Sequence, residues 1–312
     1  MFPAPARPRS ERTRRNHVWR TSRAWQTVKF MPTVFRQAMC NEAFKDRPFV
    51  DQCRALRGAG YEGIEIAPFT LTADPLDVSP AERRGYREIM AGEGLTFVGL
   101  HWLLVTPLNL HVTTPDAALR ERSWQYVWNL VDLCADLGDN GIMVFGSPDQ
   151  RKTTGGATVA EATRHFVDGL ARIAPHAGNC GVTVLVEPLP LCLANVVRTL
   201  AESAAVINEI GNPAIQTMFD VHNTADETEP HEQLIERYGP QIRHVHVNEM
   251  DGGCPGAGDY DFVPLFRALD RINYQGWISL EVFDFETSPD KIANDSITYL
   301  KRKAEKAEEA EA

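Results

Sequence analysis

The chain has 312 residues, 43% of them hydrophobic, and a formal net charge of −10. This length suits one α/β barrel or two smaller domains. The acidic balance argues against a nucleic-acid partner, and no run of about 18 apolar residues predicts a membrane span. The six cysteines are scattered, without a CxxC motif or a secretory signal, which predicts reduced thiols and a cytoplasmic protein.

The first thirty residues differ in composition from the rest. They contain eight Lys or Arg and one Glu, a charge of +7, so the other 282 residues carry −17. We interpret residues 1–30 as a basic, disordered extension; an Arg-rich transit peptide is the alternative.

From residue 31 onward, short apolar runs alternate with helical patterns. Strands are expected at 34–40, 63–68, 96–102, 141–146, 183–188, 215–220, 242–247 and 277–283. Helices are expected at 47–59, 80–92, 115–137, after the loop 147–157 up to about 180, and at 199–210, 229–238, 261–272 and 288–303. Eight such pairs predict a single (β/α)8 TIM barrel over 31–303. Residues 304–312 contain only Ala, Glu and Lys, and are expected to be a charged tail, either a solvated helix end or a frayed terminus.

Each of the last four strands ends in a residue that can bind a metal: Glu187, Asp220, His246 and Glu281. Because side chains alternate along a strand, Glu187 shares a face with Leu185, and Asp220 shares one with Met218. The opposite faces are mostly apolar and suit a covering layer of helices. In a barrel, all four ligands therefore converge at the carboxyl end of the strands, where active sites lie.

Three carboxylates and one imidazole form a ligand set that favours one divalent ion, Mn²⁺ first and Mg²⁺ or Co²⁺ as alternatives. Such an ion polarises a carbonyl group and acidifies the neighbouring C–H bond. Glu187 and Glu281 are the expected pair that removes and returns the proton. Helix capping or pairing with Arg is the structural alternative for any one of the four.

Further polar residues share the predicted interior face. Glu65 is a candidate substrate ligand or acid/base, with a structural role as the alternative, and His101 is a candidate catalytic base. His222 and Asn223 directly follow Asp220, and Asn248 lies on the face of His246; these three are candidate substrate ligands. His244, one layer deeper, is expected to be a hydrogen-bonded core residue.

The segments around the four ligands, including Val-Glu187-Pro-Leu, Phe-Asp220-Val-His and Ser-Leu-Glu281-Val-Phe, resemble the xylose-isomerase-like barrel superfamily. The similarity lies in its sugar phosphate isomerase/epimerase branch, which includes ketose 3-epimerases, hydroxypyruvate isomerase and the inosose enzymes. This resemblance implies that Glu187, Asp220, His246 and Glu281 bind the metal and that the two glutamates exchange protons with a sugar. It also implies a homo-oligomer, a dimer or tetramer.

Three positions depart from the ketose 3-epimerase pattern. Gly252 stands where those enzymes carry Arg, Leu193 where they carry Glu, and Asn223 where they carry His. The sequence therefore predicts an isomerase or epimerase of a keto-sugar or related polyol. The alternative is a lyase of 3-keto-glycosides, including C-glycosides, with His101 as base and a small partner subunit. An abasic-site endonuclease or a non-catalytic sugar-binding protein is a more distant alternative, and the charge of −17 opposes the former.

Overall fold

The computed structural model describes residues 35–309. The predicted basic extension, 1–30, lies outside the described residues.

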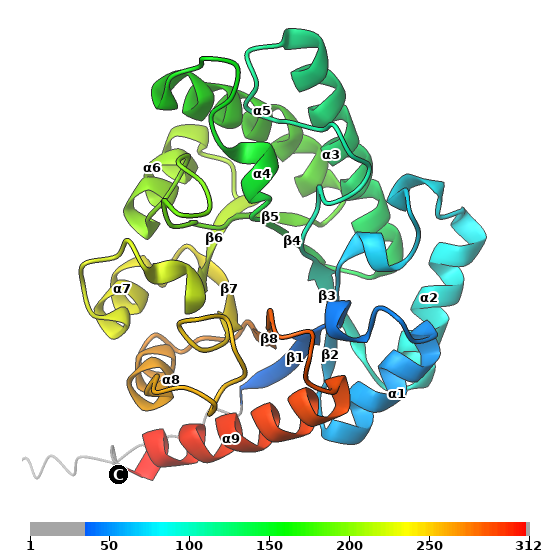
Figure 1. Ribbon diagram of the computed structural model, residues 1–312, viewed down its shortest axis with the longest axis vertical. Coiled ribbons are helices and arrows are strands. Elements are labelled where there is room, and N and C mark those ends of the chain that lie inside the picture. Colours follow the sequence, from blue (N-terminus) through cyan, green and yellow to red (C-terminus); the bar gives the residue numbers. More distant parts are fainter. Residues whose placement is uncertain (1–34, 310–312) are drawn as a thin grey trace, which may run out of the picture. The chain divides into compact units, whose positions relative to one another are not determined.

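Eight parallel strands form a closed barrel in chain order (Figure 1). Closure comes from pairing of the last strand with the first, as Arg36 lies opposite Trp277. The strands are β1 (Arg36–Cys40), β2 (Gly63–Ile66), β3 (Thr96–Leu100), β4 (Ile142–Phe145), β5 (Thr183–Val186), β6 (Ile215–Asp220), β7 (Ile242–Val247) and β8 (Trp277–Leu280).

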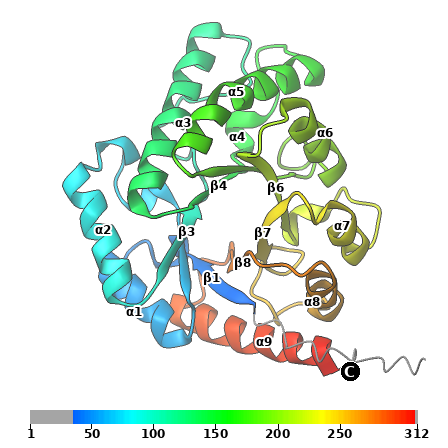
Figure 2. The same cartoon turned by 180° about the vertical axis from the view of Figure 1, so that it is seen from behind.

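The helices lie outside the ring of strands in both views (Figures 1 and 2). They are α1 (Phe49–Ala59), α2 (Pro80–Gly92), α3 (Ala117–Leu137), α4 (Pro148–Arg151), α5 (Val159–Asn179), α6 (Leu200–Ile210), α7 (His231–Tyr238), α8 (Phe262–Arg271) and α9 (Pro289–Glu309). Four 3-10 turns add η1 (Asn41–Phe44), η2 (Pro68–Thr70), η3 (Pro75–Asp77) and η4 (His222–Thr224). The predicted (β/α)8 barrel is thus confirmed.

Two elements differ from the sequence prediction. The short helix α4 forms inside the segment expected to be a loop. Helix α9 continues through Glu309, so the expected charged tail from residue 304 is largely helical. Ala307 explains the extension, because its side chain is buried in the core cluster that contains Phe266 of α8.

The side chains of β5 and β6 alternate between two cores, as predicted. Leu185 and Met218 pack together with Val144 in a small cluster inside the barrel. Val184 and Ile215 belong instead to the larger core that includes the surrounding helices. This alternation directs Glu187 and Asp220, two residues beyond Leu185 and Met218, toward the barrel axis. Among residues 35–309, no helix combines the length and the apolar character needed to cross a membrane.

Candidate functional site

The four predicted metal ligands meet at the carboxyl ends of β5 to β8. One donor atom from each of Glu187, Asp220, His246 and Glu281 lies within 4.8 Å of the others. The Nδ1 atom of His246 lies 2.9 Å from Glu281 Oε2 and 3.5 Å from Asp220 Oδ2. The structure therefore brings together four residues that are separated by up to 94 positions in the chain.

Burial governs the charges of this cluster, because all four side chains are almost inaccessible to solvent. Burial, and then the charges of Glu281 and Asp220, raise the pKa of Glu187 well above its ordinary value. Burial likewise raises the pKa of Glu281. Burial also opposes ionisation of Asp220, but the adjacent His246 leaves the pKa of Asp220 below its ordinary value. Without a cation, the three carboxylates disfavour full ionisation together.

The cluster fits a divalent metal ion. Asp220 Oδ2 is buried and accepts no hydrogen bond from any residue in the described range, 35–309. That oxygen lies 3.5 Å from His246 Nδ1, close enough for both atoms to bind one ion. Oxygen donors with one imidazole nitrogen suit Mn²⁺, Mg²⁺ or Co²⁺. Glu187, Asp220, His246 and Glu281 could together hold such an ion.

Glu65 lies beneath the cluster, in the barrel interior. Its carboxylate is 3.1 Å from His246 Nε2 and 2.8 Å from His244 Nε2. Burial opposes its charge, but the two histidines hold the pKa of Glu65 well below its ordinary value. An Nε2–H bond to Glu65 would leave His246 Nδ1, which here lies 2.9 Å from Glu281 Oε2, as the nitrogen that binds a metal in place of that contact. Glu65 is fully buried and does not line the cavity. Its role as a substrate ligand stays a prediction, and its contacts with His244 and His246 suit the structural alternative.

His101 is also fully buried and does not line the cavity, although one of its ring nitrogens lies within 4.8 Å of a carboxylate oxygen of Glu281. Its role as base stays a prediction. Its Nε2 lies 2.8 Å from Glu42 Oε2, and its Nδ1 lies 3.7 Å from Glu65 Oε1. The next residue, Trp102, lines the cavity instead and donates from Nε1 to Glu281 Oε1 at 2.8 Å. Trp102 has a φ of 51°, so the backbone turns immediately after β3. This turn directs the indole, rather than the imidazole, toward the site.

The other three candidates also differ in whether they line the cavity. His222 and Asn223 of η4 line the cavity, and Asn223 Nδ2 donates to Glu187 Oε1 at 2.9 Å. Asn248 is fully buried, and its Oδ1 accepts from the backbone N–H of His222 at 2.8 Å. Asn248 thus holds the loop after β6, and a substrate contact by Asn248 stays a prediction.

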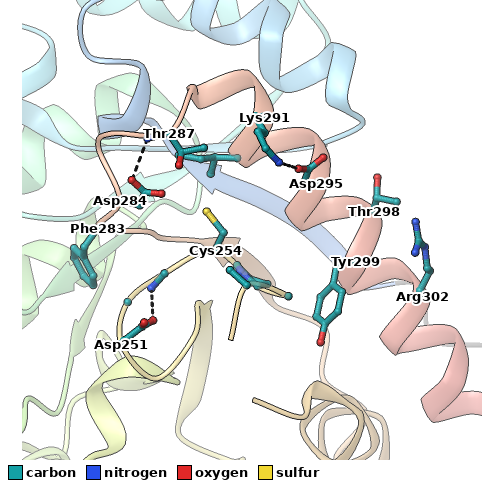
Figure 3. Close-up of a pocket in the computed structure, with 16 residues that line it drawn as sticks. Asp251, Cys254, Phe283, Asp284, Thr287, Lys291, Asp295, Thr298, Tyr299 and Arg302 are labelled. Carbon is teal, nitrogen blue, oxygen red and sulfur yellow. Dashed lines mark hydrogen bonds and ion pairs between the residues drawn. The ribbon is translucent and has the colours of Figure 1, made fainter. Parts of the chain in front are cut away.

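A cavity of about 450 Å³ opens above the cluster. Glu187 and Glu281 form part of its lining, so both carboxylates face the space that a substrate would occupy. A larger cavity of about 800 Å³ lies beside it, between the β7–α8 loop and α9 (Figure 3). That cavity shares Phe283 with the first but contains none of the four metal ligands.

Residues 53–303, most of the chain, match the family model described as xylose isomerase-like TIM barrel. The chain belongs to this family. The resemblance inferred from the motifs is thereby confirmed.

Known members of the xylose isomerase-like TIM barrel family include sugar epimerases similar to this chain. An L-ribulose 3-epimerase from Methylomonas sp. (strain DH-1) is 25% identical over 236 residues, covering 76% of this chain and 79% of the relative. A solved structure of L-ribulose 3-epimerase has a TM-score of 0.76 at 22% identity, covering 88% of this chain and 96% of its own. The apo structure of 3-keto-D-glucoside 4-epimerase from E. coli has a TM-score of 0.74 at 20% identity, covering 86% and 99%. These structural likenesses show a shared fold.

Sequence reasoning missed three residues that shape the site of this family member. Trp102, which directly follows His101, is not among the candidates predicted from the sequence. Gly146, just after β4, approaches Glu187 so closely that a Cβ atom there would lie 2.1 Å from Glu187 Oε2. The buried Arg151 of α4 donates from Nη1 to the carbonyl of Glu187 at 2.7 Å. The position of Gly146 at the end of a predicted strand could have indicated a close contact, whereas nothing in the sequence indicated a role for Arg151.

Proposed function

We propose that this protein is a divalent-metal-dependent isomerase or epimerase of a keto-sugar or a related polyol. The single observation that carries the proposal is the position of Glu187 and Glu281. Both belong to the metal-binding cluster, and both face the same cavity. The sugar epimerases among the relatives support the same reaction class.

A bound divalent ion would supply Lewis acidity toward the oxygens of a keto-sugar. The chain would supply the proton transfers. One glutamate removes the proton from the carbon next to the carbonyl, which gives an enediolate-like intermediate, and the other glutamate delivers a proton. Burial raises the pKa of both glutamates in the metal-free protein, and a bound cation would lower their pKa again, which favours the ionised form that accepts a proton. Asn223 orients Glu187, and Trp102 orients Glu281, through the hydrogen bonds described above.

The first prediction concerns these two glutamates. Glu187→Gln and Glu281→Gln should each lower turnover of the responsive keto-sugar by about 10²–10⁴-fold, because each removes a proton-transfer group. Turnover is measured on Mn²⁺-loaded protein against a panel of keto-sugars, and circular dichroism tests whether the fold is kept. Glu286→Gln is the matched control, since Glu286 is exposed on the β8–α9 loop and lies outside the cavity lining. Full turnover in either of the first two variants contradicts the mechanism.

A lyase acting on 3-keto-glycosides is the second candidate, favoured by the apolar side chains that line the outer cavity. It would remove the same kind of proton and expel a β-leaving group. Reaction in D₂O separates the two functions. An epimerase or isomerase incorporates solvent deuterium at carbon of an intact sugar, whereas a lyase releases the aglycone.

A further inference from the structure

Exposed apolar side chains gather at one end of the barrel. In the part of the chain that the structure describes, seven large apolar residues are exposed: Val105, Leu108, Val159, Leu191, Leu193, Met250 and Phe285. Every one lies between the carboxyl end of a strand and the first turn of the following helix. Exposed apolar side chains that line a common cavity, as three of these do, typically mark a binding site. Its location at the mouth connects it to the catalytic cavity.

Three of these residues do more than surround the mouth, because they line the 450 Å³ cavity itself. Leu108, which is 78% exposed, and Val105 come from the β3–α3 loop, and Leu193 comes from the β5–α6 loop. Leu189 lies deeper on the same wall. The cavity therefore has a charged floor, formed by the glutamates, and an apolar outer wall.

An aromatic pair joins the floor to that wall. The rings of Trp102 and Phe283 are stacked, with centroids 5.9 Å apart and planes inclined by 15°. Trp102 is fixed from below by its hydrogen bond to Glu281. Phe283 is fixed from behind by Gly252, whose φ is +84° and whose Cβ, if present, would lie 2.5 Å from the Phe283 ring. Both rings are thus held in place at the edge of the cavity before any ligand binds.

We infer that this outer wall is a subsite for the apolar, preferably aromatic, aglycone of a glycoside whose sugar ring occupies the charged floor. The inference rests on the proposed function, since the proposed site supplies the floor. A polar monosaccharide alone leaves Leu108, Val105 and Leu193 in water, whereas an aryl group attached to the sugar covers them. A cavity of this volume lies in the range of sites that hold ligands of drug size.

The larger neighbouring cavity does not compete for this role. It contains neither Glu187 nor Glu281, and some of its charged groups are paired, as Lys291 contacts Asp295 and Asp284 accepts from the backbone N–H of Thr287 (Figure 3). A second copy of the chain is the other candidate to cover the apolar wall, and it becomes an outcome of the test.

The test compares the binding of phenyl and methyl β-D-glucopyranoside to the full-length, Mn²⁺-loaded protein by calorimetry. Both ligands lack the ketone, so binding is measured without turnover. We expect phenyl glucoside to bind at least about tenfold more tightly, the gain that burial of a phenyl ring supplies. Leu108→Ser combined with Leu193→Ser should reduce this preference to below about threefold. Val159→Ser is the matched control, because Val159 is exposed at the same end but outside this cavity.

Equal affinities of the two glucosides, or a preference that survives the double substitution, overturn the subsite. A change of oligomeric state in the double variant with an unaltered preference also overturns it and assigns the wall to a subunit interface. The turnover assays under the proposed function are independent of these results. A preference for phenyl glucoside without turnover of any keto-sugar or 3-keto-glycoside refutes the proposed reaction but leaves the subsite. Turnover without a preference for phenyl glucoside refutes the subsite alone.

Discussion

At the scale of single residues, the convergence of Glu187, Asp220, His246 and Glu281 was predictable, and the contacts of the residues behind them were not. Alternation along a strand places Asp220 on the face of Met218 from the sequence alone. The contact between Glu65 and His246 instead joins β2 to β7 across the barrel interior. The short distance between these two side chains depends on closure of the whole sheet. Glu65 was a candidate substrate ligand from the sequence. No local sequence pattern distinguishes such a ligand from a residue that positions His246.

The position of Glu65 predicts an effect on metal affinity. Glu65→Gln should weaken Mn²⁺ binding by about 10–100-fold, because the variant no longer fixes the imidazole with a charged acceptor. Competition with a chromophoric chelator measures this affinity, and circular dichroism checks the fold. The control is Glu62→Gln, an exposed residue just before β2. Unchanged Mn²⁺ affinity in a folded Glu65→Gln protein would contradict the positioning role.

The perturbed pKa values predict that metal binding releases protons. Burial and neighbouring carboxylates raise the pKa of Glu187, and the pKa of His246 is also raised, by Glu65 and Glu281 against the effect of burial. Both groups therefore retain protons in the metal-free protein, and a cation must displace them. Mn²⁺ affinity should rise with pH between about pH 6 and pH 8. Calorimetry in two buffers of different ionisation enthalpy measures the released protons; identical enthalpies in both buffers refute the expectation.

At the scale of elements, long periodic segments were predicted well and short ones were not. Helix α2 has the predicted bounds, since its apolar period, Ser79 cap and following Gly94 agree. Helix α4 has four residues, too few to establish a period, and its role depends on contacts of Arg151 with β4 and β5. Helix α9 was ended too early, because an Ala-, Glu- and Lys-rich segment gives no sign that Ala307 packs against the core.

The junction of β4 with β5 supplies an element-scale prediction. Gly146→Ala places a methyl group about where Glu187 Oε2 now lies, so the carboxylate must move by about 1 Å or more. Displacement of that size in a catalytic group costs about 10²-fold in kcat/KM. Steady-state turnover measures the effect once a responsive sugar is identified. Gly85→Ala on α2 is the matched control, as a Cβ there meets no neighbouring atom; equal activity of the two variants would show that Glu187 tolerates the shift.

At the scale of the whole molecule, the four candidate ligands come from four consecutive strands, β5 to β8, and β8 closes the barrel against β1. A bound ion would therefore connect half of the barrel wall at one end. Metal binding to the folded chain alone should stabilise it by about 2.7 kcal/mol when the free ion is at 100 times its Kd.

We therefore expect Mn²⁺ to raise the unfolding temperature by about 5 °C or more relative to protein treated with EDTA. Thermal unfolding followed by circular dichroism measures the shift, with Mg²⁺ and Co²⁺ as parallel samples that rank the metals. Asp220→Asn weakens the ligand set and removes the ion pair with His246 that lowers the pKa of Asp220, so this variant should be less stable than wild type in EDTA and respond less to Mn²⁺. A wild-type protein whose unfolding temperature is the same in EDTA and in Mn²⁺ would show that the cluster does not bind the ion in the folded state.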